Sequence, residues 1–99
     1  MANKVIEWDS AALKQFGAAI EYIAQDSLQN AEKVYSAVIQ KIEALPGNPE
    51  MHPPDKYKLN NTGSYRAFEL YRFRVAYFVG EDRIRILRVR HTSQEPKTF

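Results

Sequence analysis

The stretch RFRVAYFVGEDRIRILRVRH, residues 72–91, alternates apolar and charged residues on both sides of a short turn. A period of two is typical of β-strands, and the turn residues GED at 80–82 interrupt it, so the stretch predicts strands at 73–79 and 83–91. It carries six arginines, one histidine and only two acids. A functional interpretation has to explain why so much positive charge is placed on the expected central strands.

The alternation in the second of these strands slips at Ile86-Leu87, where two apolar residues are adjacent. Either a β-bulge lies there or both faces of the strand are covered. Alternation therefore does not assign every arginine to a face, and it predicts that they do not all point the same way. The arginines concerned are Arg66, Arg72, Arg74, Arg83, Arg85, Arg88 and Arg90.

Two segments upstream have apolar residues at the spacing of an amphipathic helix. Asp9 or Ser10 should cap the first helix. Its expected buried face is Leu13, Phe16, Ile20 and Ile23. The second helix should be capped by Ser27 and stopped by Pro46-Gly47. Its expected buried face is Ala31, Val34, Val38, Ile42 and Leu45. The short break between the two segments predicts an antiparallel helical hairpin.

A short strand is expected at 4–8 (KVIEW) and another at 65–71, which gives the order β-α-α-β-β-β. The loop at 46–64 is long and rich in Pro, Asn and Gly, which indicates a functional or partly mobile segment. We expect one domain, residues 1–99, of the α+β class. The helical hairpin should pack on one face of a small, mostly antiparallel, twisted sheet. The other face should be open and should present the arginines.

Composition excludes several classes of protein. The chain has 99 residues, 44% of them hydrophobic and 26% charged, as in an ordinary globular domain. It has no cysteine and only two histidines, which argues against disulfides and a structural zinc site. No nucleotide-binding glycine motif or nucleophile elbow is present, so we expect neither cofactor nor metal. No apolar run is long enough to cross a membrane and no signal-peptide core is present, so a cytoplasmic protein is expected.

The net charge of +2 conceals an asymmetry between the two halves of the chain. Residues 1–50 hold four Lys/Arg and seven Asp/Glu, a balance of −3, whereas residues 51–99 hold ten and five, a balance of +5. A basic half indicates a polyanionic partner such as RNA, DNA or an acidic protein segment. The alternative is that the arginines pair with the domain's own acids, and charge alone does not decide between them.

Three side chains have the chemistry of a catalytic site. Arg74 lies near the start of the strand expected at 73–79, and a guanidinium makes bidentate hydrogen bonds to phosphate. His91 ends the last strand, and a histidine can transfer protons near neutral pH. Asp55, between Pro54 and Lys56 in the long loop, has the chemistry of a base. The structural alternatives are a solvated edge arginine, an ordinary surface histidine and a neutralised acid.

The segments FRVAYFV (73–79) and IRILRVRH (84–91), with the closing HTSQEP (91–96), resemble the C-terminal part of the RelE/ParE superfamily of toxins from type II toxin–antitoxin (plasmid-stabilisation) pairs. The length, the element order and a hairpin ending near Leu45-Pro46 agree, so the resemblance covers nearly the whole chain. It implies a growth-inhibiting toxin whose partner is a small antitoxin protein. RelE-like and YoeB-like members cleave mRNA on the ribosome without a metal, whereas ParE-like members poison DNA gyrase.

The first target hypothesis that the resemblance implies is ribosome-dependent mRNA cleavage. Arg74 would then stabilise the scissile phosphate, His91 would protonate the leaving group, and Asp55 would be the base. A base, a cation and an acid are what such a phosphoryl transfer needs. The residues expected to bind the RNA are Lys56, Lys58, Arg66, Arg88 and Arg90.

Some features depart from the cleaving branch. Cleaving members have lysines on the first strand of the C-terminal meander, where this chain has Ala67 and Glu69. They have an arginine just after the last strand, where this chain has Thr92. Their C-terminal tyrosine corresponds at best to Phe99, which has no hydroxyl. The long helices are more typical of the ParE-like branch. The second hypothesis is therefore a gyrase poison without nuclease activity. A third is a non-toxic homologue that only binds its antitoxin. A homodimer and a hetero-oligomer with the antitoxin both remain open.

Overall fold

The computed structural model describes residues 4–92 and 98–99. Residues 93–97, which include most of the HTSQEP stretch, lie outside the described residues. The elements follow the expected order. They are β1 (Val5–Trp8), α1 (Ser10–Asp26), α2 (Leu28–Glu43), the short 3-10 helix η1 (Leu45–Gly47), β2 (Tyr65–Leu70), β3 (Phe73–Val79) and β4 (Arg83–His91).

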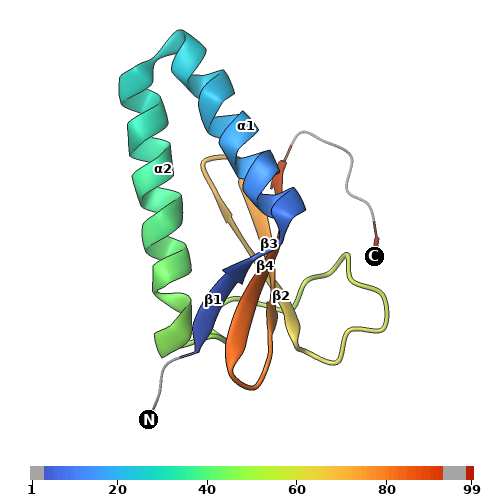
Figure 1. Cartoon of the computed structure of the whole chain (residues 1–99). Helices are drawn as coiled ribbons and strands as arrows, with labels where there is room; N and C mark the ends of the chain where they lie inside the picture. The colour runs from blue at the N-terminus through green and yellow to red at the C-terminus, as the bar shows by residue number, and fades with distance from the viewer. Residues whose placement is uncertain (1–3, 93–97) are drawn as a thin grey trace.

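The four strands form one sheet in the order β1-β4-β3-β2. The pairs β2·β3 and β3·β4 are antiparallel, and β1 pairs with β4 in parallel. Both helices lie on one side of the sheet, and the loop between η1 and β2 bulges out on the other side near the C-terminal residues (Figure 1). The expected two-layer α+β fold is confirmed.

The slip in the sequence of β4 is a β-bulge. Ala76 of β3 pairs with Arg88, but the next residue, Tyr77, pairs with Ile86, so Leu87 is the extra residue. A one-residue shift reverses which face each later side chain occupies. The bulge therefore keeps the apolar residues before and after it on the helix side. It also places the arginines before and after it on the opposite face.

The second helix matches its expectation closely. Ser27 caps α2, with its hydroxyl oxygen accepting a hydrogen bond of 3.1 Å from the backbone N–H of Asn30. Such a cap stabilises a helix by about 1 kcal/mol. The buried face contains the predicted residues. They are Ala31, Val34, Val38 and Ile42, followed by Leu45 in η1.

The first helix is rotated relative to its expectation. Leu13 was predicted to be buried, but 57% of it is exposed, and Ala12 is fully buried in its place. Ala12 and Phe16 are one turn apart, and the small alanine lets α1 approach β4 closely. The side chain of Asp9, the N-cap residue, does not cap the helix because it accepts a hydrogen bond from Arg85.

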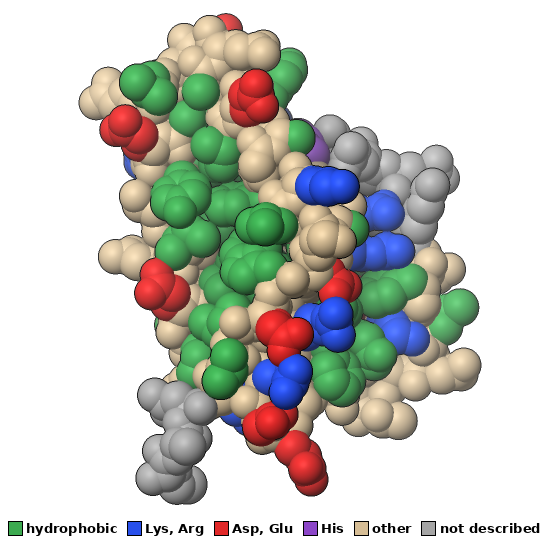
Figure 2. Space-filling view, in the orientation of Figure 1, with side chains coloured by type: hydrophobic (Ala, Val, Ile, Leu, Met, Phe, Trp, Pro, Cys, Tyr) green, Lys and Arg blue, Asp and Glu red, His purple; other side chains and the backbone are tan. Residues whose placement is uncertain are grey.

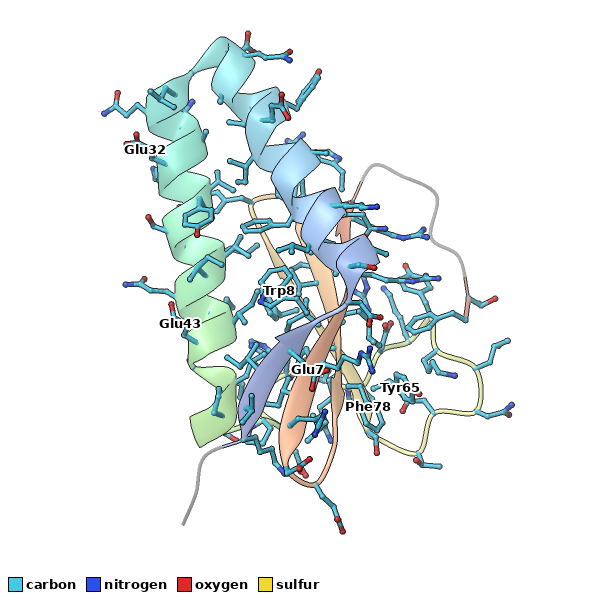
Figure 3. The ribbon with its side chains drawn as sticks, viewed as in Figure 1. Glu7, Trp8, Glu32, Glu43, Tyr65 and Phe78 are labelled. Carbon is cyan, nitrogen blue, oxygen red and sulfur yellow. The ribbon has the colours of Figure 1, made fainter. Side chains whose placement is uncertain are left out.

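Aromatic rings connect the hairpin to the sheet. The ring of Phe16 stacks on Trp8 of β1 and on Tyr35 of α2, with both centroid distances 5.6 Å. Trp8 lies between the hairpin and the sheet, whereas Glu32 and Glu43 project from the outer side of α2 (Figure 3). Hydrophobic side chains also gather on the outer surface of the hairpin (Figure 2). Among the described residues, no helix has the length and apolarity needed to cross a membrane.

Candidate functional site

Five arginines point away from the helices and define what we call the cationic face. Their register shows this, because Arg74 pairs with Arg90, and Arg85 and Arg88 face Phe78 and Ala76 of β3. Side chains directly opposite each other in a strand pair share a face. The cationic face consists of Arg74 of β3 and of Arg83, Arg85, Arg88 and Arg90 of β4.

The end of the cationic face nearest β1 is neutralised by the chain's own acids. Arg83 forms ion pairs with Glu7 and Asp82, and Arg85 donates a 2.7 Å hydrogen bond to Asp9. Acidic and basic side chains alternate in this region of the surface (Figure 2). Half-exposed pairs of this kind contribute little stability, because water screens them. They do, however, remove these two arginines from the set that is available to a polyanion.

Arg74 is held by two carboxylates. Its guanidinium donates to Asp55 and to Glu69, each at 2.9 Å, and lies 4.8 Å from the centre of the Tyr57 ring. Asp55 is only 3% exposed. Burial alone would lower the pKa of Arg74, but the hydrogen bonds and charges of Asp55 and Glu69 outweigh it and raise that pKa. The predicted phosphate clamp is thus already paired within the chain.

The loop at 48–64 places Asp55 against the sheet. The Asp55 N–H donates to the Tyr65 carbonyl at 2.8 Å, and the Ala67 N–H donates to the Pro53 carbonyl at 3.2 Å. The loop therefore runs alongside β2 and pairs with its free edge. Arg66 fastens the same loop by donating to the carbonyls of His52 and Gly63. Arg66 therefore has a structural role here. The face that we expected to be open is partly covered by this loop.

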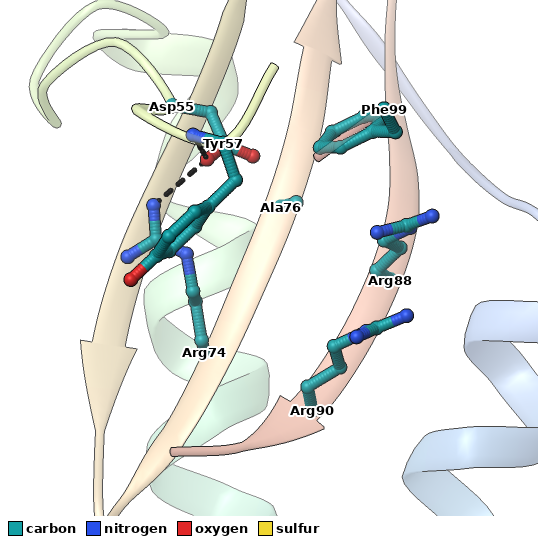
Figure 4. A pocket seen from close by; sticks show the side chains of 7 residues that line it. All are labelled: Asp55, Tyr57, Arg74, Ala76, Arg88, Arg90 and Phe99. Atoms are coloured by element: carbon teal, nitrogen blue, oxygen red, sulfur yellow. Dashed lines mark hydrogen bonds and ion pairs between the residues drawn. The ribbon is translucent and has the colours of Figure 1, made fainter. Parts of the chain in front are cut away.

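A small hollow remains between the loop and the strands. It is lined by Asp55, Tyr57, Arg74, Ala76, Arg88, Arg90 and Phe99 (Figure 4). Its volume is about 30 Å³. That is room for a water molecule and far too small for a nucleotide. Any larger anion must bind over the rim of this hollow and not inside it.

Arg88 and Arg90 lie side by side along this rim (Figure 4). Arg88 lies over the ring of Phe99, with 4.3 Å between its guanidinium carbon and the ring centre. Burial and then the charge of Arg90 lower the pKa of Arg88, and Asp55 only partly opposes them. Arg90 has no ion pair among the described residues. The two guanidinium groups repel each other along this rim, and an anion bound there would relieve the repulsion.

The structure does not bring His91 to this site. His91 pairs with Phe73, and their rings meet edge to face with 5.4 Å between centroids. Phe73 belongs to the core beneath the helices. His91 therefore lies on the helix side of the sheet and Arg74 on the other. Of the three predicted catalytic residues, Asp55 and Arg74 are in contact, and His91 is across the sheet from them.

The two predicted lysines lie on the loop. Lys56 is exposed, with its ammonium 5.2 Å from the centre of the Tyr57 ring. The Lys58 ammonium donates to the Leu59 carbonyl and lies 5.5 Å from the ring centre of Phe99. Hydrogen bonds between the backbones of Phe99 and of residues 57 and 59 hold this ring beside the loop. Both lysines thus border the cationic face and do not enter the hollow.

Sequence reasoning missed Glu69 as a partner of Arg74, although a signal was present. Strands β2 and β3 are joined by only two residues, and this places Glu69 directly opposite Arg74. Opposite charges in such a pair attract. Within the described ranges, no group of three or more His, Asp or Glu side chains is positioned to hold a metal ion. The chemistry that this site can supply is electrostatic binding of an anion.

A family model described as "ParE toxin of type II toxin-antitoxin system, parDE" matches residues 6–96. One similar solved structure is the chromosomal ParDE toxin–antitoxin system from P. aeruginosa, with 16% identity, a TM-score of 0.68, and coverage of 89% of this chain and 95% of that one. Another is the YoeB dimer from Staphylococcus aureus, with 17% identity, a TM-score of 0.59, and coverage of 91% and 98%. No curated protein matches the chain. At these identities the solved structures establish similarity of fold alone.

Proposed function

Because this chain belongs to the ParE toxin family of type II toxin–antitoxin systems, we propose that it inhibits growth by binding DNA gyrase and not by cutting mRNA. Its partner in the cell would be a cognate antitoxin that holds it inactive. Gyrase acts in the cytoplasm, and we propose that the toxin acts there too. Binding would use the Arg88–Arg90 part of the cationic face.

One observation carries the choice of target. Arg74 and His91 lie on opposite faces of the sheet, as their partners Arg90 and Phe73 require. Metal-free RNA cleavage needs a base, a cation and an acid around one phosphate, all within hydrogen-bond reach. The pairing of Arg74 with both Asp55 and Glu69 further argues against its use as a phosphate clamp. A toxin that acts by binding needs none of these groups to be free.

The experiment measures both targets with the same protein. Purified toxin is added to gyrase in a plasmid-supercoiling assay, and mRNA 5′ ends are mapped in cells that express it. We expect loss of supercoiling at a toxin concentration that leaves mRNA ends unchanged. New mRNA ends in the ribosomal A site, with supercoiling intact, would establish the ribonuclease alternative. No effect on growth at all would favour the homologue that only binds an antitoxin.

A further inference from the structure

A second hollow lies away from the cationic face, where the helical hairpin meets the β2–β3 turn. Its volume is about 510 Å³, which lies within the range of sites that bind small molecules, about 300–1,000 Å³. We call this hollow the tip groove. It is lined by Ile23 of α1, by Asn30, Lys33 and Val34 of α2, and by Tyr71 and Arg72 of the turn. Unlike the hollow on the cationic face, it has room for a whole small molecule.

The tip groove offers a ligand three kinds of contact. Val34 is buried and Ile23 is partly buried, and these two side chains form an apolar floor. The ring of Tyr71, which is 45% exposed, is the one aromatic ring among the lining residues. Lys33 and Arg72 are exposed cations, and the Lys33 ammonium lies 6.0 Å from the centre of the Tyr71 ring. A ligand that has a flat ring and an anionic group would match all three.

The charge of the two rim cations indicates which anionic group would fit. Within the described part of the chain, neither Lys33 nor Arg72 forms an ion pair, whereas Arg83 and Arg85 are each paired with a carboxylate. The lining residues include no acid. A phosphate monoester carries about two negative charges and offers three strong acceptor oxygens, so it can pair with two cations at once. A phosphate therefore matches this rim better than a single carboxylate does.

The β2–β3 turn does not need the side chains of Tyr71 and Arg72 for its own geometry. Both residues have positive φ angles, and a two-residue hairpin of this kind favours Asn-Gly because bulky residues are unfavourable there. The Thr92 N–H donates to the Arg72 carbonyl at 2.7 Å and ties the turn to the end of β4. A turn that keeps a ring and a guanidinium against the preference of its backbone indicates a role for these side chains themselves.

We propose that the tip groove binds a nucleoside monophosphate. The base would stack on the Tyr71 ring above the apolar floor, and the phosphate would pair with Lys33 and Arg72. The side-chain amide of Asn30 has both a donor and an acceptor, which is the combination that pairs with the edge of adenine, so an adenine nucleotide is the best match.

A longer nucleic acid fits the tip groove less well. It needs a row of rings on which successive bases stack, and the groove has the single ring of Tyr71. The groove shares no residue with the cationic face, so this inference stands or falls independently of the proposed target.

The test titrates AMP into the full chain and follows the backbone amide NMR signals. We expect the largest changes at residues 23, 30, 33, 34, 71 and 72. Two fragments of the nucleotide separate its contacts, because adenosine lacks the phosphate and inorganic phosphate lacks the base. Each fragment should bind at least about fivefold more weakly than AMP.

Three variants test the side chains that carry the proposal. Lys33→Glu and Arg72→Glu should each weaken AMP binding at least about fivefold, because each replaces an attraction by a repulsion. Tyr71→Asn removes the ring, but asparagine adopts positive φ readily, so the turn should persist. The loss of stacking in this variant should also weaken AMP binding at least about fivefold.

Lys14→Glu is the matched control, because it reverses an exposed cation of α1 that does not line the groove. It should leave the affinity for AMP within about twofold. Equal binding of AMP and adenosine, or of AMP and inorganic phosphate, would overturn the proposal. So would signal changes centred on the cationic face. If the oligonucleotide hexaadenylate binds the groove more tightly per nucleotide than AMP does, the site is for nucleic acid and the proposal is wrong.

Discussion

Asp55 and Arg74 form a 2.9 Å ion pair that joins the long loop to the start of β3. The Asp55 side chain is 1% exposed, whereas Glu69, which binds the same guanidinium at the same distance, is 53% exposed. One arginine thus pairs with one buried and one exposed carboxylate. Removing each carboxylate in turn therefore compares the free energy contributed by a buried pair with that contributed by an exposed pair.

We predict that Asp55→Ala lowers the free energy of unfolding by about 2–3 kcal/mol, measured by urea denaturation. The change removes the buried partner of Arg74 and leaves this partly buried cation less well compensated. It also removes the acceptor for the Tyr57 N–H, which orders the loop.

Glu69→Ala serves as the matched control and should cost less than about 1 kcal/mol, because exposed pairs are screened by water. Equal losses for the two variants would show that burial of Asp55 contributes nothing to the strength of the pair.

The bulge at Leu87 leads to a second prediction. Deleting Leu87 would restore strict alternation in β4 and leave Arg88 and Arg90 on the cationic face, because Ile86 and Val89 would still point toward the helices. The bulge is then needed only because the chain has one extra residue at this point. We therefore expect the deletion variant to keep cooperative thermal unfolding, as followed by circular dichroism.

Leu87→Ala is the control for this deletion, because it keeps the extra residue and removes only a partly buried side chain. It should unfold cooperatively with a lowered midpoint. Loss of cooperative unfolding in the deletion variant, with cooperative unfolding kept in Leu87→Ala, would contradict this expectation.

The sequence predicts the strands within one residue because alternation is a local property. The bounds of β3 and β4 were expected correctly, and β2 ends one residue early because Tyr71 enters the turn. The slip at Ile86-Leu87 was recognised, but its two explanations have opposite consequences for the arginines. Only the pairing of β4 with β3 distinguishes a bulge from a strand that is covered on both faces. The local pattern of residues in β4 carries no information about that pairing.

The candidate site was less predictable for the same reason. Asp55 and Arg74 meet because a loop of irregular structure folds back along β2, and no periodicity describes such a path. The exchange of Leu13 for Ala12 on the buried face of α1 depends on how closely the helix approaches β4. That distance is set by packing of the whole domain and not by the spacing of apolar residues.

His52 leads to a prediction about pH. Its Nε2 atom is buried and has no hydrogen-bond partner among the described residues, and its ring centroid lies 4.9 Å from that of Phe68. Burial and then the charge of Lys41 lower the pKa of His52 below 6.5. As the pH falls below about 6.5, the unfolded chain binds a proton that the folded chain resists, so stability is lost. Above about pH 6.5, the neutral His52 ring makes its full contribution to the stability of the folded chain.

The measurement compares urea midpoints near neutral pH and at pH 5 or so for the wild type and for His52→Phe. The variant keeps an aromatic ring against Phe68 but has no titrating group, so its midpoint should fall less on acidification. Acidic side chains affect both proteins alike, and the difference between them isolates His52. An identical fall in the two proteins would contradict the assignment.

The β2–β3 turn provides a fourth prediction, because Tyr71 and Arg72 have φ angles of 50° and 64°, in the left-handed region. Replacing Tyr71→Asn and Arg72→Gly together should raise the free energy of unfolding by about 1–2 kcal/mol, because the new residues adopt positive φ at little cost. Thermal denaturation measures the gain. A destabilised variant would show that packing of Tyr71 outweighs the backbone strain.

The last prediction concerns growth inhibition. Under the proposed function, the double variant Arg88→Ala with Arg90→Ala should lose at least about tenfold of its potency in the supercoiling assay. These arginines lie side by side on the rim of the hollow, and loss of a central arginine commonly costs an interface about 1–4 kcal/mol. Both side chains project from the surface of the sheet, so the urea midpoint should change little.

His91→Ala is the comparison that separates the two targets. Its ring contacts Phe73 on the helix side of the sheet, so its loss should lower stability slightly and leave inhibition of gyrase within about twofold after correction for folding. If His91 were the general acid of an RNA-cleaving site, the same change would remove about 10²- to 10⁴-fold of the cleavage rate. Loss of toxicity in a folded His91→Ala protein, with toxicity retained in the double arginine variant, would therefore reject the gyrase proposal and restore the ribonuclease hypothesis.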